Sequence, residues 1–258
     1  MATVVLIRGL MRDKRHWSEF AHLLQKRVPN GGKVISLDIL GNGDFVHCKS
    51  PLNIDEYAKE LLLRLRRMTS DDCYLVGLSM GGMVALQMAS LEPQPECTVR
   101  DGKIKGLAVL NTSAANLSPW YQRFQIGAVF SAFRRRVKAP KSSLLEATII
   151  ALTSVTQKNN LRLALKWTQY RAKIHTRFTN VLRQLWACWQ FNCPAVIGVP
   201  ITLVSGLEDK LVNPDCSQKL ARHYRSKLIE FDYAGHDLSL DCPEKLCQQL
   251  IESFFAKP

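Results

Sequence analysis

The chain has 258 residues and a net charge of +13, with 47% hydrophobic and 22% charged residues, a composition that excludes intrinsic disorder. Eight cysteines are scattered without a Cys-x-x-Cys pair or a histidine at zinc-ligand spacing, which argues against a disulfide framework or a metal site and favours reduced thiols in the cytoplasm. The amino-terminal segment has no positively charged leader and no small-residue cleavage site, so no secretory signal is expected. The longest apolar run, near residues 144–155, is too short to be a transmembrane segment.

Short apolar runs alternate with amphipathic segments along the chain. Six runs have the composition of strands: Val4–Arg8, Val34–Asp38, Tyr74–Val76, Gly106–Leu110, Ile201–Ser205 and Leu228–Phe231. Helical periodicity follows several of them: His16–Arg27, Ile54–Met68 and Pro214–Arg225. This alternation predicts an α/β fold with a mostly parallel, doubly wound sheet.

The third strand leads into the sequence Gly-Leu-Ser-Met-Gly-Gly at residues 77–82, and the helical segment Met83–Ala89 follows. A serine between glycines, at a sharp turn from strand to helix, is typical of a nucleophile elbow. The turn exposes the hydroxyl and directs the helix N-terminus toward developing negative charge. We therefore predict that Ser79 is a catalytic nucleophile.

A nucleophilic serine needs a histidine base, and the base needs an acid that fixes its tautomer. Asp209 follows the strand that ends at Ser205, and His236 follows the strand that ends at Phe231, so all three side chains are expected at the carboxyl edge of the sheet. Asp209 could instead cap a helix, leaving Glu208 or Asp215 as the acid. His236 could be a loop histidine bonded to backbone.

The intermediate of acyl transfer also needs two backbone N–H donors for its oxyanion. The residue after the nucleophile, Met80, is expected to supply one of them. The loop after the first predicted strand is expected to supply the other, which places the second donor at Leu10.

About ninety residues separate Leu110 from Ile201, far more than a single crossover helix requires. We therefore predict a helical cap, residues 114–198, inserted in a core formed by residues 1–113 and 199–258. The cap is rich in aromatic residues, most of which are expected to pack against other apolar side chains.

The cap also carries most of the net charge, because residues 114–198 contain thirteen basic residues and one acid, Glu146. Such an excess attracts anions over a Debye length and beyond. The sequence leaves open what this charge serves. It could attract an acidic protein partner, an anionic substrate or an acidic membrane surface, or it could be only a solvated face. The residues considered for binding are Arg134, Arg135, Arg136, Arg162 and Lys166.

The chain resembles the α/β-hydrolase fold enzymes over essentially its full length. The resemblance rests on five segments in family order: the Gly9-Leu10 loop, the turn at residues 38–43, the Ser79 elbow, Gly206 to Asp209, and Gly235-His236. Arg8 departs from the family pattern, which usually has histidine before the glycine. Serine at the nucleophile position argues against a dehalogenase.

The resemblance implies a serine hydrolase that cleaves a carboxylic ester without a cofactor. The elbow is also similar to that of perhydrolases and of carbon–carbon bond hydrolases or lyases, so it does not select the reaction. The basic helical cap resembles that of the pimeloyl-acyl-carrier-protein methyl ester esterases of biotin synthesis, which implies a small-molecule or carrier-protein-bound substrate. A protein that only binds an anionic partner is the non-enzyme alternative, and no nucleic-acid partner is expected.

Overall fold

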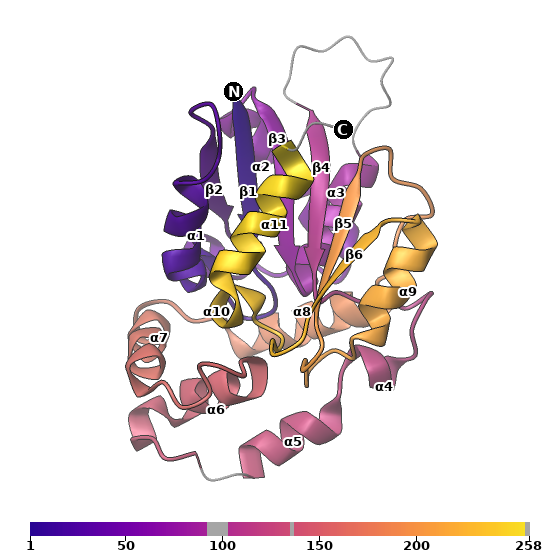
Figure 1. Cartoon of the computed structure of the whole chain (residues 1–258). Helices are drawn as coiled ribbons and strands as arrows, with labels where there is room; N and C mark the ends of the chain where they lie inside the picture. Colours follow the sequence, from indigo (N-terminus) through magenta and orange to yellow (C-terminus); the bar gives the residue numbers. More distant parts are fainter. Residues whose placement is uncertain (92–102, 135–136, 256–258) are drawn as a thin grey trace.

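The computed structural model describes residues 1–91, 103–134 and 137–255, so Cys97, Arg135 and Arg136 lie outside the described ranges. Its centre is a parallel sheet of six strands in the order β2-β1-β3-β4-β5-β6 (Figure 1). The strands are β1 (Ala2–Ile7), β2 (Lys33–Leu37), β3 (Asp72–Leu78), β4 (Ile104–Leu110), β5 (Ile201–Gly206) and β6 (Lys227–Phe231). The predicted α/β architecture is confirmed.

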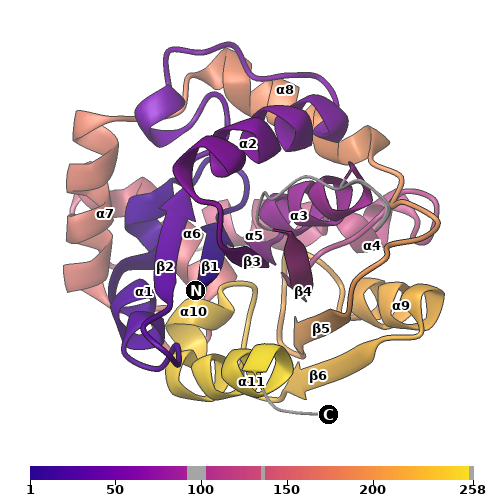
Figure 2. The ribbon, with the colours of Figure 1, turned by 90° about the horizontal axis from the view of Figure 1, so that it is seen from above.

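Helices cover both faces of the sheet, because the buried strands are apolar on both sides. In β1, Val5 and Ile7 belong to the core cluster under α2, α3 and α9, whereas Val4 and Leu6 belong to the cluster under α1 and α11 (Figure 2). These helices, with a short one before α11, are α1 (Ser18–Gln25), α2 (Ile54–Met68), α3 (Met80–Leu91), α9 (Asp215–Tyr224), α10 (Leu238–Asp241) and α11 (Pro243–Phe255). Short 3-10 turns occur at η1 (Lys14–Trp17), η2 (Gly43–Phe45) and η3 (Lys141–Ser143).

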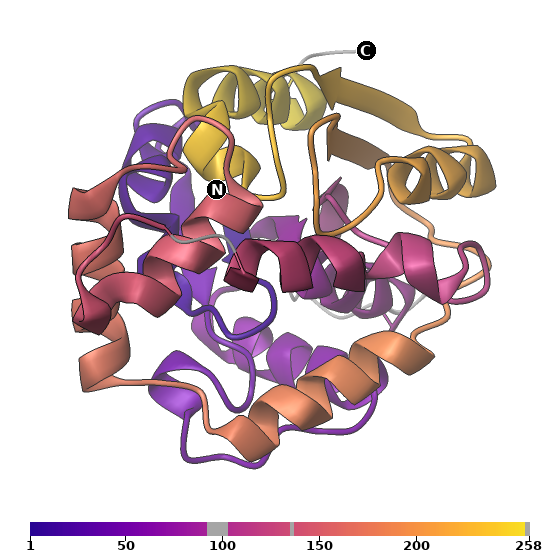
Figure 3. The same ribbon diagram turned by 90° about the horizontal axis from the view of Figure 1, so that it is seen from below.

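Five helices lie in the segment between β4 and β5, and they gather below the carboxyl ends of the strands (Figures 1 and 3). They are α4 (Trp120–Arg123), α5 (Ile126–Arg134), α6 (Leu144–Thr153), α7 (Leu161–Lys173) and α8 (Phe178–Gln190). We use the name cap for residues 114–198. Open α/β sheets bind their ligands at the carboxyl edge of the strands. The cap faces this edge.

The acid of the cap sequence, Glu146, joins the cap to the core. Its side chain is only 2% exposed on α6 and forms ion pairs with Arg12 at 2.8 Å and with Arg171 at 3.3 Å. The Arg12 guanidinium also lies over the Trp167 ring, 4.5 Å from its centroid. Burial lowers the pKa of neighbouring His16 to about 4, which keeps that ring neutral at pH 7.

The cap aromatics differ widely in burial. Trp167 and Phe191 are buried, and Phe124 and Tyr170 are half-buried. The other seven are exposed: Trp120, Tyr121, Phe130, Phe133, Phe178, Trp186 and Trp189. Some exposed rings still pack on each other, since the Trp120 and Trp189 centroids are 6.3 Å apart. That most of the cap aromatics pack rather than contact a ligand stays a prediction.

Six of the cysteines in the described ranges are free thiols: Cys48, Cys188, Cys193, Cys216, Cys242 and Cys247. No cluster of three metal-ligating side chains occurs among the described residues. No helix in this part of the chain combines the length and the apolar character needed to cross a membrane.

Candidate active site

Ser79 occupies a sharp turn between β3 and α3. Its φ of 57° lies in the left-handed region, which strains any residue that has a Cβ atom. Glycine is required around this turn, since a Cβ on Gly77 would overlap the backbone of Gly81, and one on Gly81 would overlap the carbonyl oxygen of Ile7. The strain and the close backbone contacts are those of a nucleophile elbow.

The loop that follows β1 runs directly beside Ser79. A Cβ on Gly9 would lie 3.1 Å from the Ser79 Cβ and 3.0 Å from the Leu78 carbonyl oxygen. Within the described part of the chain, neither the Leu10 amide nor the Met80 amide donates a hydrogen bond to a protein acceptor. Both predicted oxyanion donors therefore keep their N–H groups available.

Asp209 and His236 form a buried acid–base pair. His236 Nδ1 lies 2.7 Å from Asp209 Oδ2, and the two side chains are 7% and 1% exposed. The other carboxylate oxygen, Oδ1, accepts from the backbone N–H groups of Leu211 at 2.7 Å and Val212 at 3.0 Å. Asp209 thus stabilises its own turn and orients His236 at the same time.

The alternative acids lie elsewhere. Glu208 is exposed, and Asp215 lies in the first turn of α9, where Gln122 donates to its carboxylate at 3.4 Å. Neither has a hydrogen bond to His236 among the described residues. The described hydrogen bonds also include none between Ser79 Oγ and His236, a contact that is often long before substrate binds.

Asn111, which the sequence analysis did not identify, connects the loops that carry Asp209 and His236. It lies just after β4 with φ of 45° and is 1% exposed. Its side-chain amide donates to the carbonyl oxygens of Gly235 at 3.0 Å and His236 at 2.9 Å, while its oxygen accepts from Gly206 N at 2.9 Å. Asparagine is one of the few residues that tolerate this backbone conformation, but nothing in the sequence alone indicates its three backbone partners.

Hydrogen bonds of Asp241 and Asp237 attach the cap to the histidine loop. Asp241 accepts from Gly235 N at 2.7 Å on the loop and from Thr156 N at 2.9 Å on the cap. The Asp237 amide also donates to the carbonyl oxygen of Thr153, the last residue of α6, at 2.7 Å. A movement of the cap would therefore act directly on the loop that carries His236.

Arg8, the departure from the family pattern, forms a buried ion pair. Its guanidinium donates to Asp237 at 2.6 Å, with both side chains less than 5% exposed, and lies over the Trp17 ring. Burial acts to raise the pKa of Asp237, but the charge and hydrogen bonds of Arg8 outweigh it, so this pKa is lowered from the ordinary 3.8. The pair ties the end of β1 to the residue after His236.

We predict that Asp237→Asn lowers the free energy of unfolding by about 3 kcal/mol or more, because it leaves Arg8 buried without a counter-charge. Urea titration measures this loss. Since the carboxylate has a lowered pKa in the folded state, its contribution is present above pH 4 and is lost as the pH falls further, so the two proteins should converge in acid. Equal stability at pH 7 would show that the pair contributes nothing.

The described basic residues singled out in the cap lie on two helices, with Arg134 at the end of α5 and with Arg162 and Lys166 one turn apart on α7. Arg134 is exposed with its guanidinium 5.6 Å from the Phe130 ring centroid, Arg162 is exposed, and Lys166 forms an ion pair with Glu19 at 3.6 Å. Arg135 and Arg136 are not among the described residues. Their part in binding stays a prediction.

The fold and the elbow define an α/β hydrolase, and the comparison with protein families agrees. The chain belongs to the Alpha/beta hydrolase family, whose profile matches residues 4–249.

Two curated relatives and one solved structure illustrate the range of similar proteins. The biotin biosynthesis bifunctional protein BioHC of Teredinibacter turnerae is 29% identical over 46% of this chain, a match that spans only 20% of BioHC. RutD of Pseudomonas savastanoi pv. phaseolicola, described as a candidate carbamate hydrolase, is 26% identical over 96% of this chain and 92% of its own. The enol-lactonase of Burkholderia xenovorans shares the fold at a TM-score of 0.73 and 17% identity, covering 99% and 92% of the two chains.

Proposed function

We propose that the chain is a serine hydrolase that cleaves carboxylic esters. The observation that carries this proposal is the buried hydrogen bond of 2.7 Å between Asp209 and His236. These residues follow β5 and β6, at the same edge of the sheet as the strained Ser79 elbow after β3. A carboxylate that holds Nδ1 leaves Nε2 as the base, the arrangement that activates a serine hydroxyl. The free amides of Leu10 and Met80 support it further.

In the proposed reaction, Ser79 Oγ attacks the ester carbonyl carbon while its proton passes to His236 Nε2. The Leu10 and Met80 amides stabilise the oxyanion of the tetrahedral intermediate, each worth about 3 kcal/mol in comparable enzymes. The intermediate then expels the alcohol, which takes the proton from His236, and leaves an acyl group on Ser79. Water, deprotonated by His236, releases the acid and restores the serine. No cofactor takes part.

Related chemistries on the same fold are the rivals. Carbon–carbon bond hydrolysis, lyase or perhydrolase activity would use the same three residues, and carbamate hydrolysis is suggested by the description of RutD. We expect the protein to turn over p-nitrophenyl butyrate faster than a matched p-nitrophenyl carbamate or a vinylogous diketone. A higher kcat/KM on either of the latter would transfer the proposal to that reaction.

A methyl ester carried by an acyl carrier protein is the narrower proposal for the substrate. Two observations support it. Residues 114–198 contain thirteen basic residues and one acid, Glu146, which is buried and paired. The chain is also similar to part of BioHC. Electrostatic steering of such an acidic partner predicts a rate that falls as salt is added. A protein that only binds anions would show the salt dependence without turnover. A cytoplasmic location is likewise proposed, supported by the six free thiols named above.

A further inference from the structure

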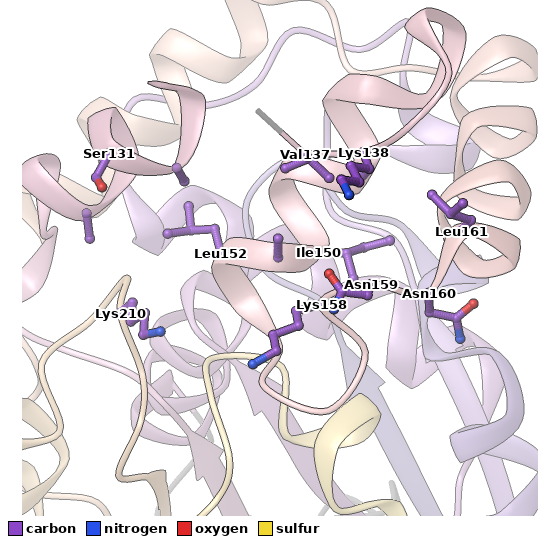
Figure 4. Close-up of a pocket in the computed structure, with 14 residues that line it drawn as sticks. Ser131, Val137, Lys138, Ile150, Leu152, Lys158, Asn159, Asn160, Leu161 and Lys210 are labelled. Carbon is purple, nitrogen blue, oxygen red and sulfur yellow. The ribbon is translucent and has the colours of Figure 1, made fainter. Parts of the chain in front are cut away.

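A cavity of about 670 Å³ lies within the cap, apart from the triad side chains. It is bounded by α5, α6, the residues before α7 and the loop after β5 (Figure 4). Ser79 and His236 do not line it. Its volume is within the range of about 300–1,000 Å³ that small-molecule sites occupy.

The walls that α5 and α6 give to this cavity are mostly apolar. On α5, Ala128 and Ala132 line the space with small side chains, beside the polar Ser131. On α6, Ala147 and Ile150 line the cavity and are packed in a cluster with buried Trp167. The apolar wall of α6 can accommodate an aliphatic chain, whereas the polar lining residues Asn159 and Asn160 lie before α7.

Three lysines from separate segments also line the cavity: Lys138, Lys158 and Lys210. They come from the loop after α5, the loop between α6 and α7, and the loop after β5, and they lie at separate places around the cavity (Figure 4). All three are exposed, none forms an ion pair with another described residue, and no carboxylate is present in the lining. A partly apolar space lined by cations that have no described counter-ion is complementary to an amphipathic anion.

The cavity touches the loop that carries Asp209, because lining residue Lys210 directly follows Asp209 in the chain. The loop that carries His236 does not line the cavity, but lining residue Leu152 precedes Thr153, whose carbonyl oxygen accepts from the Asp237 amide at 2.7 Å. A ligand bound in the cavity would therefore lie beside the Asp209 loop and against the end of α6, which is bonded to the His236 loop.

We infer that this cavity binds the aliphatic chain of an anionic ligand, and that the lysines around its lining attract the carboxylate or phosphate group of that ligand. The inference rests on the proposed function in one respect: it assigns the substrate class as acyl esters whose non-reacting part carries a negative charge. The ligand is identified by its chemistry, a chain with an anionic end.

Isothermal titration with decanoate, decyl phosphate and decyltrimethylammonium tests the site, because these probes share a chain and differ in charge. We expect both anions to bind and the cation not to bind, and their relative affinities distinguish carboxylate from phosphate. Lys158→Gln and Lys210→Gln should each weaken anion binding by about two- to fivefold, the usual range for exposed ion pairs. The matched control is Lys173→Gln, an exposed lysine of α7 outside the cavity, which should leave binding unchanged.

Ala151→Phe places a bulky ring in the cavity and should abolish anion binding without affecting the lysines. Equal binding of the cation, equal effects of Lys173→Gln and Lys158→Gln, or undiminished binding by Ala151→Phe would overturn the inference. Since these titrations involve no turnover, they are independent of catalysis. Ester hydrolysis without anion binding would contradict the inferred site and leave the proposed function standing. Anion binding without hydrolysis would contradict only the proposed function.

Discussion

Ser79→Ala is expected to reduce ester hydrolysis by about 10⁶-fold in kcat, the loss seen when serine proteases lose their nucleophile. The hydroxyl is the atom that forms the acyl-enzyme, and no other described side chain occupies the elbow between β3 and α3. The fold should persist, because alanine retains the Cβ atom and faces the same left-handed backbone strain as serine. Initial rates on p-nitrophenyl butyrate and a circular dichroism melt measure the two effects.

Ser205→Ala is the matched control for that experiment. Ser205 is a buried serine of β5, close to the same sheet edge, and its hydroxyl has no hydrogen-bond partner among the described residues. Its loss should leave the rate nearly unchanged. Retention of more than a small residual rate by Ser79→Ala would show that the reaction does not pass through this serine.

Asp209→Asn is expected to lower kcat by about 10⁴-fold at neutral pH, since an amide facing Nδ1 favours the wrong tautomer of His236. The asparagine oxygen can still accept from the Leu211 and Val212 amides, so the turn should remain folded. Glu208→Gln and Asp215→Asn are the comparison variants, because they remove the two alternative acids. We expect both to stay within a few-fold of the parent.

The comparison decides which carboxylate acts. A larger loss in Glu208→Gln than in Asp209→Asn would contradict the assignment drawn from the 2.7 Å hydrogen bond. Equal small losses in all three variants would mean that His236 works without an acid partner. Stopped-flow measurement of acylation distinguishes these results from a change in deacylation.

Much of the fold was predictable because the strands are short apolar runs separated by strongly periodic helices. The segment Ile54–Met68 was predicted with the bounds of α2, since Asn53 caps its first turn by accepting from Glu56 N at 2.9 Å, and apolar residues recur along one face. The elbow at Ser79 was also predictable from the sequence, because close backbone contacts at this turn require its glycines. Local chemistry determined each of these elements.

Features that depend on distant segments were not predictable. Asn111 is an ordinary residue in the sequence, and its role comes from three backbone groups that the folded loops place around it. The lysines at positions 138, 158 and 210 are far apart in the chain, and only the folded structure shows that they line one cavity. The exposure of the cap aromatics was not predictable for the same reason, since composition does not say which helix faces are covered by another element.

Labelling with a fluorophosphonate, followed by peptide mass mapping, tests the central claim most directly. The probe reacts with a serine that is activated by a base beside an oxyanion site, and the account predicts a single adduct on the peptide that contains Ser79. The adduct should form slowly in Asp209→Asn and be absent in Ser79→Ala. An active protein that gives no adduct, or one that carries the adduct on another serine, would contradict the assignment of Ser79, Asp209 and His236 as the catalytic residues.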